Sequence, residues 1–327
     1  MSDSYYKVFE STVRGDDNAL RRIRQFYGTE VFKWREDSAH TAIEVACRHG
    51  YKDCLLELLD AYPVHQMKKS EIPAVNKAVE LCCNLGRAEC LDLLLKSGAN
   101  PNTLISESKG TPLHLIASRD HINCGIVLLR HKADVNLSNS NGVTPLHKAA
   151  QNIRLSCIRL FLQNGANPNA TTSEGFTPLH LVALDHLGYS MRNHTLVCVS
   201  VLLSCKTVDM NCQSNGGFSP LHLACVSPNV ATAHMLLDYG ASCRQRTNGA
   251  ESKLPIDCLP DDDILGEENS KQIQGLRQRL AICYKGQVRP LFLLCEVFIK
   301  QQLGTNWQDK LKLLPVPLSV KRSLNRL

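Results

Sequence analysis

The chain has 327 residues, of which 43% are hydrophobic and 21% charged, and its formal net charge is +6. This composition provides enough apolar material for a sizeable core and excludes a chain that is disordered throughout. The length suits one long repeat domain with a small appendix, or two ordinary domains.

The positive charge is concentrated at the C-terminal end. Residues 284–327 hold eight Lys or Arg and two Asp or Glu, residues 261–283 carry a net −2, and the rest of the chain therefore carries only +2. A nucleic-acid-binding array concentrates positive charge on its binding face, so this near balance predicts no nucleic-acid partner. Arg21, Arg22 and Arg24 are interpreted as a solvated helix face.

Several features predict an intracellular protein. No run of 18 apolar residues occurs, so neither a membrane span nor a membrane partner is expected. The first residues lack the charged and then apolar pattern of a secretory leader. There are fifteen cysteines and no Cys-x-x-Cys pair, which predicts reduced, buried thiols rather than a disulfide framework. Five cysteines recur at one equivalent repeat position: Cys54, Cys90, Cys124, Cys157 and Cys198. We expect a cytoplasmic protein, and a nuclear location stays open.

In chain order, the first predicted element is a helix pair over Val8–Phe26, with its turn at Arg14–Asp16. A four-residue signature, Thr/Ser-Pro-Leu-His, then recurs with starts 33, 33 and 42 residues apart. The four copies are Thr111–His114, Thr144–His147, Thr177–His180 and Ser219–His222. Weaker or degenerate copies are Thr41–Glu44, Lys77–Glu80 and Leu254–Asp257.

The signature has a physical rationale as the start of a helix. The threonine or serine caps the helix, and proline fits the first turn, where no amide donor is needed. The second helix of each repeat ends at a glycine such as Gly98, Gly165 or Gly240, which supplies a left-handed stop. Asn141 and Gly142 fit the tip of a hairpin between repeats. No single repeat buries its apolar face alone, so the stack is the folding unit.

The period of 33 and the Thr-Pro-Leu-His signature resemble the ankyrin repeat. The resemblance implies an all-α ankyrin-repeat solenoid. We expect a degenerate N-terminal capping unit over residues 1–40, an array of about six repeats over 41–253, and a truncated last repeat with a linker helix over 254–285.

One repeat is nine residues too long. The excess lies around Leu187–Thr195, which we place between the two helices of that repeat. Insertions in repeat proteins map to loops and often serve binding, but a tolerated surface loop is an equally good interpretation.

No catalytic or cofactor motif is found, and an enzyme is not expected. The repeat histidines occur once per repeat and cannot converge on one ion as zinc requires, so we expect no metal and no cofactor. The resemblance implies that they hydrogen-bond within the repeat scaffold. Asp261–Asp263 is interpreted as the start of a helix, where carboxylates favour the dipole.

The candidate target-binding surface is the concave side of the array, formed by hairpin tips and exposed positions of first helices. The candidate residues are Glu107, Lys109, Arg119, Asn139, Lys148, Gln151, Asn152, Glu174, Phe176, Asn215 and Phe218.

The last segment contains a short apolar helix. Leu291, Cys295 and Ile299 share one face at i, i+4 and i+8, and Pro290 fits the first turn. A second apolar stripe predicts burial on two sides. From periodicity alone, a cap on the solenoid is the simpler interpretation.

The residue identities change that interpretation. Pro290 and Leu291, with Cys295 and Ile299 at four-residue spacing, are followed by Leu314-Pro315-Val316-Pro317. This order resembles the elongin-binding and cullin-selecting elements of a SOCS box. Over nearly the whole chain, the sequence is similar to the ankyrin repeat and SOCS box family. Residues 286–327 are then expected to form a helical SOCS box.

The resemblance implies a role for each matching residue. Pro290, Leu291, Cys295 and Ile299 would bind elongin C, with elongin B in the same complex, by helix-in-groove recognition. Leu314, Pro315, Val316 and Pro317 would select cullin-5 with its RING-box protein. The implied function is a substrate-recognition subunit of a cullin-5/elongin B/C ubiquitin ligase that holds an unidentified target protein on its repeats. The alternative is an ankyrin-repeat interaction scaffold with no link to ubiquitin ligation.

Overall fold

The computed structural model describes residues 2–32, 41–105, 110–184, 192–227, 229–248, 252–260 and 267–284. The expected SOCS box over 286–327 and the acidic run Asp261–Asp263 lie outside the described residues. The chain divides into two compact units, one formed by residues 1–182 and 204–208 and the other by 183–203 and 209–327.

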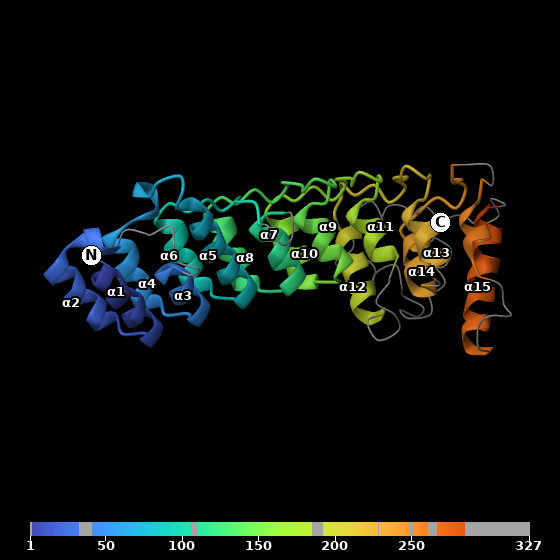
Figure 1. Ribbon diagram of the computed structural model, residues 1–327. Helices are drawn as coiled ribbons and strands as arrows, with labels where there is room; N and C mark the ends of the chain where they lie inside the picture. The colour runs from blue at the N-terminus through green and yellow to red at the C-terminus, as the bar shows by residue number, and fades with distance from the viewer. Residues whose placement is uncertain are drawn as a thin grey trace, which may run out of the picture. The chain divides into compact units, whose positions relative to one another are not determined.

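The first unit consists of helices joined by short turns (Figure 1). Its helices are α1 Ser2–Arg14, α2 Asp17–Tyr27, η1 Thr29–Phe32, α3 Ala42–His49, α4 Lys52–Ala61, η2 Val64–Gln66, α5 Ile72–Leu85, α6 Ala88–Lys96, α7 Pro112–Arg119, α8 Ile122–Arg130, α9 Pro145–Gln151 and α10 Leu155–Gln163, followed by α11 Pro178–Ala183, whose last residue begins the second unit.

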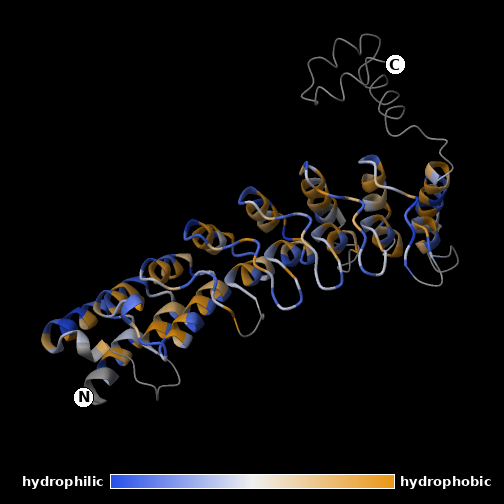
Figure 2. Cartoon of the chain, turned by 90° about the horizontal axis from the view of Figure 1, so that it is seen from above, coloured by the Kyte–Doolittle hydropathy of each residue, from blue (hydrophilic) through white to orange (hydrophobic). Residues whose placement is uncertain are grey.

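The second unit continues with α12 Arg192–Leu203, α13 Pro220–Val226, α14 Val230–Asp238, η4 Pro255–Cys258 and α15 Glu267–Tyr284. The described parts of the chain contain no strand, and the isolated bridge between Ile105 and Gly110 closes one hairpin. Figure 2 shows hydrophobic residues gathered on the helices and polar loops joining one repeat to the next. The all-α prediction is confirmed for the residues described.

The signature residues begin helices as predicted, with one exception. Thr144 accepts a hydrogen bond from the backbone N–H of His147, and Ser219 accepts one from His222. Lys77, by contrast, lies inside α5, which begins at Ile72. The expectation of a repeat start at Lys77 is wrong because lysine has no short side-chain acceptor for a cap.

The cysteines at the equivalent repeat position are part of the buried core. All five at the equivalent repeat position are at most 2% exposed, as predicted. Burial raises the pKa of the Cys90 and Cys124 thiols to about 12. The described cysteines are all free thiols, and a neutral thiol at these positions packs as a small hydrophobe.

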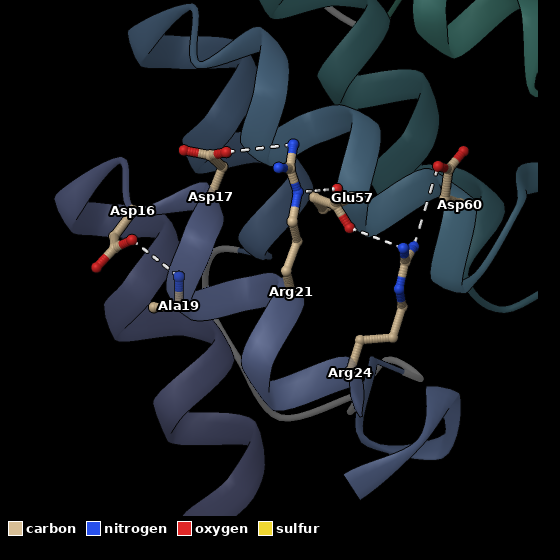
Figure 3. A network of polar contacts seen from close by, with 7 residues as sticks. All are labelled: Asp16, Asp17, Ala19, Arg21, Arg24, Glu57 and Asp60. Atoms are coloured by element: carbon tan, nitrogen blue, oxygen red, sulfur yellow. Dashed lines mark hydrogen bonds and ion pairs between the residues drawn. The ribbon is translucent and has the colours of Figure 1, made fainter. Parts of the chain in front are cut away.

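The N-terminal helix pair turns at Gly15 as predicted, but its arginines are not simply solvated (Figure 3). Arg21 donates through Nε to Glu57 of α4 at 2.7 Å. Arg24 lies 3.1 Å from the second carboxylate oxygen of Glu57. Glu57 is only 5% exposed, so these pairs tie α2 to the first full repeat. The partner is 36 residues away from Arg21, which local sequence patterns do not reveal.

The long repeat lies in α11 and α12. The helices α9 and α10 are separated by three residues, whereas eight residues separate α11 from α12. Helix α12 also has 12 residues, against nine in α10. The insert therefore lengthens the second helix as well as the connection, and the expectation that Leu187–Thr195 is wholly between the helices is wrong for its last residues.

Helix α15 closes the last repeat of the second unit. Ile273, Leu276 and Leu280 are each at most 1% exposed, and the helix packs on α14 and η4. Arg279 pairs with Asp238 and lies 2.8 Å from Nδ1 of His234. The 18-residue α15 thus packs on α14 at the end of the described repeats.

Candidate interaction surface

The signature histidines join neighbouring repeats and position the candidate surface. The Nδ1 atom of His114 accepts from the backbone N–H of Thr111 at 3.0 Å, which leaves the proton on Nε2. Nε2 then donates to the carbonyl oxygen of Val143 in the next hairpin, 2.9 Å away. In the second unit His222 reaches Lys253 in the same way at 3.2 Å. Both ring nitrogens are therefore used by the scaffold.

Burial fixes the neutral form of these rings. His147 is fully buried, and desolvation lowers its pKa to about 4. Burial also lowers the pKa of His114 and of His222. A neutral ring with one donor and one acceptor matches the two bonds that each histidine makes. Among the described residues, no group of three or more His, Cys, Asp or Glu could hold a metal ion.

The hairpin after α8 shows how the loop tips are built. The Asn139 side-chain oxygen accepts from the backbone N–H of Asn141 at 3.0 Å and of Val143 at 3.1 Å. Gly142 has φ of 71°, and the next tip approaches so closely that Ser173 donates to the Asn141 carbonyl at 2.9 Å. Asn139 therefore shapes the hairpin.

The candidates of α9 form one cluster. Lys148 donates to the Gln151 side-chain oxygen at 3.1 Å, and Asn152 donates to the Lys148 carbonyl at 2.8 Å. All three side chains are half-buried. Because the Lys148 partner is a neutral amide, its positive charge is not compensated there. Arg119, at the end of the neighbouring α7, is exposed.

The remaining candidates are distributed over both units. Phe176 packs its ring against His180 with 5.7 Å between centroids, and Phe218 packs edge-on against His222 at 6.1 Å. Asn215 is exposed and its carbonyl accepts from Asn248 at 3.1 Å. Glu174 is exposed, and Glu107 and Lys109 lie outside the described residues.

A row of asparagines that the sequence analysis missed holds the hairpins in register. Asn102 accepts from the backbone N–H of Asp134 at 2.9 Å, and Asn136 accepts from Asn167 at 2.8 Å. In the second unit Asn211 accepts from Ser242 at 2.8 Å. The signal was present as a recurring Asn/Asp-x-Asn pattern, one repeat apart.

Comparison with known proteins identifies the repeats. A family model described as ankyrin repeats (3 copies) matches residues 75–172 and 157–247. These matches cover more than half of the chain, and the chain belongs to the ankyrin-repeat family. The repeats thereby support a role in protein–protein interaction.

Two relatives are similar to this chain over part of their length. Putative palmitoyltransferase ZDHHC13 of Danio rerio is 29% identical over 222 residues, which is 68% of this chain and 33% of the relative. Potassium channel AKT2/3 of Arabidopsis thaliana is 29% identical over 126 residues, which is 38% of this chain and 16% of the relative. The chain thus matches about a third and a sixth of these proteins. In the described residues, no helix has the length and apolarity needed to cross a membrane.

Proposed function

We propose that this chain is the substrate-recognition subunit of a cullin-5/elongin B/C RING ubiquitin ligase. The ankyrin repeats hold a target protein, and residues 286–327 bind elongin C and cullin-5. The chain performs no covalent chemistry. Its contribution is proximity, because holding both partners raises the effective concentration of target lysines near the conjugated ubiquitin.

The observation that carries the proposal is the order of two short motifs after a closed array. Leu291, Cys295 and Ile299 are spaced at i, i+4 and i+8, as on one face of a helix, and Leu314–Pro317 follows at the spacing typical of a SOCS box. Helix α15 already buries Ile273, Leu276 and Leu280 against the last repeat. A further cap is not needed there, which supports docking to a partner over the simpler capping role.

The array alone is compatible with several functions. The two relatives are named as a palmitoyltransferase and a potassium channel, so ankyrin repeats occur in proteins of different activity. The function-specific element must then lie outside the repeats, and residues 286–327 are the segment with such a motif. The alternative, an interaction scaffold without ubiquitin-ligase coupling, predicts that deletion of this segment leaves every partner in place.

Co-expression of the full chain with elongin B and elongin C tests the proposal. Cys295→Phe places a large ring on the face of Leu291 and should abolish co-purification of elongin C. Glu296→Phe adds the same ring one residue later, about 100° around the helix, and should retain elongin C. Failure of the wild-type chain to co-purify elongin C, or equal loss in both variants, rejects the proposal in favour of the scaffold.

A further inference from the structure

Three rows of side chains on the first helices of the first unit include several exposed or half-buried residues. They lie four, seven and eight residues after the signature threonine, or on α5 after the aligned Lys77 inside the helix, and we call them the first-helix face. On α5 this face carries Leu81 and Leu85, and on α11 it carries Leu181. Leu85 is 45% exposed, and Leu81 and Leu181 are half-buried. Leu81 and Leu85 are therefore accessible side chains on α5, which we call the apolar row, whereas Val45 on α3 and Leu115 on α7 at an equivalent position are buried.

Cations flank the apolar row. Arg48 and Arg119 are exposed at the ends of α3 and α7, and no described residue pairs with either. Lys148 on α9 bonds the neutral amide of Gln151 at 3.1 Å. These three positive charges are therefore not neutralised within the part of the chain that the structure describes.

Acidic side chains are absent from these rows on α3, α5, α7 and α9. On these four helices no position four, seven or eight residues after the signature position holds Asp or Glu, and the residue eight positions after Thr177 on the next repeat, Asp185, lies outside the described residues. The nearest acids are used elsewhere: Glu80 is 3% exposed and pairs with Lys77 at 3.3 Å, and Asp120 accepts from the Cys157 thiol at 3.4 Å. The first-helix face is thus positive and apolar although residues 1–260 are nearly balanced in charge.

The second helices α4 and α6 differ from the first-helix face because they carry acidic side chains. Glu89 and Asp92 are on α6 and Asp53 is on α4. Glu89 pairs with Lys52 at 3.0 Å and Asp92 with Lys96 at 2.7 Å. Between α4 and α6, charges therefore compensate each other, whereas α8 and α10 carry the exposed Arg130 and Arg159 and no acid.

Extending the proposed function, on which it rests, we infer that the first-helix face binds an acidic segment of the target protein that carries apolar side chains between its carboxylates. The carboxylates pair with Arg48, Arg119 and Lys148, and the apolar groups cover Leu81 and Leu85. Helices α3, α5, α7 and α9 are in contact one after another, and neighbouring axes are about 8–10 Å apart. The three steps from Arg48 to Lys148 therefore span roughly 24–30 Å, which is about 16–20 residues of helix.

The apolar row favours a peptide over a nucleic acid. Nucleic-acid binding depends on many phosphate contacts and on aromatic rings that stack with bases. The first-helix face offers three lysine or arginine side chains and leucines, which do not stack with bases. Leucines gain free energy instead by removing apolar peptide side chains from water.

A display library of random 20-residue peptides, selected on the full chain, tests this inference. The selected peptides should be rich in Asp and Glu around Leu or Phe, and fluorescence anisotropy should show weaker binding at 0.5 M than at 0.05 M salt, as about a threefold shorter screening length implies. Arg119→Glu with Lys148→Glu should weaken binding about tenfold or more, since two ion pairs become repulsive. Arg130→Glu with Arg159→Glu makes the same charge change on the second helices and should leave binding unchanged.

Three outcomes overturn the inference: no peptide is selected, the selected peptides are neutral or basic, or both double variants lose binding equally. Tighter binding of a 20-nucleotide single-stranded oligonucleotide than of any selected peptide would assign the face to nucleic acid. These results do not depend on elongin. If no acidic peptide binds but elongin C does, only the inference of an acidic target segment is rejected. If acidic peptides bind but elongin C does not, only the proposed ligase function is rejected.

Discussion

The Nε2 atom of His147 donates to the backbone oxygen of Phe176, 2.9 Å away in the next repeat. Its Nδ1 accepts from the backbone N–H of Thr144 at 3.1 Å. One ring therefore stabilises the start of its own helix and fixes the end of the following hairpin. The candidate side chain of Phe176 is positioned by this bond.

His147→Ala should destabilise the repeats strongly. The substitution leaves the buried Thr144 N–H and the part-buried Phe176 carbonyl without these partners, at a cost of about 2–4 kcal/mol. Urea denaturation followed by circular dichroism measures this change. His194→Ala removes an exposed histidine and is the control, with an expected change within about 0.5 kcal/mol. Equal effects of the two variants would contradict a structural role for His147.

Stability should decrease as the pH falls from about 6.5 toward 4. Burial lowers the pKa of His147 from its ordinary value of 6.5 to about 4, so the unfolded chain binds protons that the folded chain does not. The stabilisation of the fold by neutral His147 is therefore complete above pH 6.5, and it is lost as the pH falls through the pKa of His147 in the folded chain. Urea midpoints at pH 7 and pH 5 measure it, and His147→Ala should depend less on pH. If the urea midpoint changed with pH by the same amount in the wild type and in His147→Ala, His147 would not be the source of the pH dependence.

Because two hairpin tips approach closely, substitution by alanine should destabilise the fold more at one glycine than at another. A Cβ atom at Gly142 would lie 2.9 Å from the Ser173 nitrogen, whereas a Cβ at Gly165 would have no neighbour within 4 Å. Both have positive φ, of 71° and 83°. Gly165→Ala should cost about 1–2 kcal/mol from strain alone, and Gly142→Ala about 1 kcal/mol or more beyond that. Equal losses in urea denaturation would mean that the tips do not constrain each other.

Local chemistry made the repeats predictable from the sequence. The caps at Thr144 and Ser219 depend on residues within one turn of helix, and the glycine stop at Gly165 depends on its own backbone. Contacts between distant residues were not predictable in this way. The ion pair between Arg21 and Glu57 has no periodic signal.

The other differences have similar physical causes. Lys77 resembles a signature position only by alignment with its neighbours, and it lacks the oxygen that a cap requires. The closure of the last repeat by α15 depends on the apolar residues Leu276 and Leu280 of a helix beyond the recognisable repeats. The candidates of the concave side were chosen as exposed positions, and several, such as Asn139, prove to shape the hairpins.

If α15 and the C-terminal segment have separate roles, a substitution in each should change a different property of the chain. Leu276→Ala removes a fully buried side chain and should destabilise the second unit by about 2–4 kcal/mol, which faster hydrogen exchange in α14 would report. Elongin C should still bind this variant. Cys295→Phe should abolish elongin C binding and leave hydrogen exchange in α14 unchanged. If Leu276→Ala also abolished elongin binding, the array cap and the docking element would not be independent. Gln278→Ala, at an exposed position of the same helix, is the control.

Calorimetric titration of the full chain with purified elongin B/C measures the proposed link between the repeats and a ubiquitin ligase. We expect one-to-one binding that is absent from a chain ending at residue 285 and from Cys295→Phe, and that persists in Glu296→Phe. No measurable binding by the folded wild-type chain, or undiminished binding by the shortened chain, would contradict it.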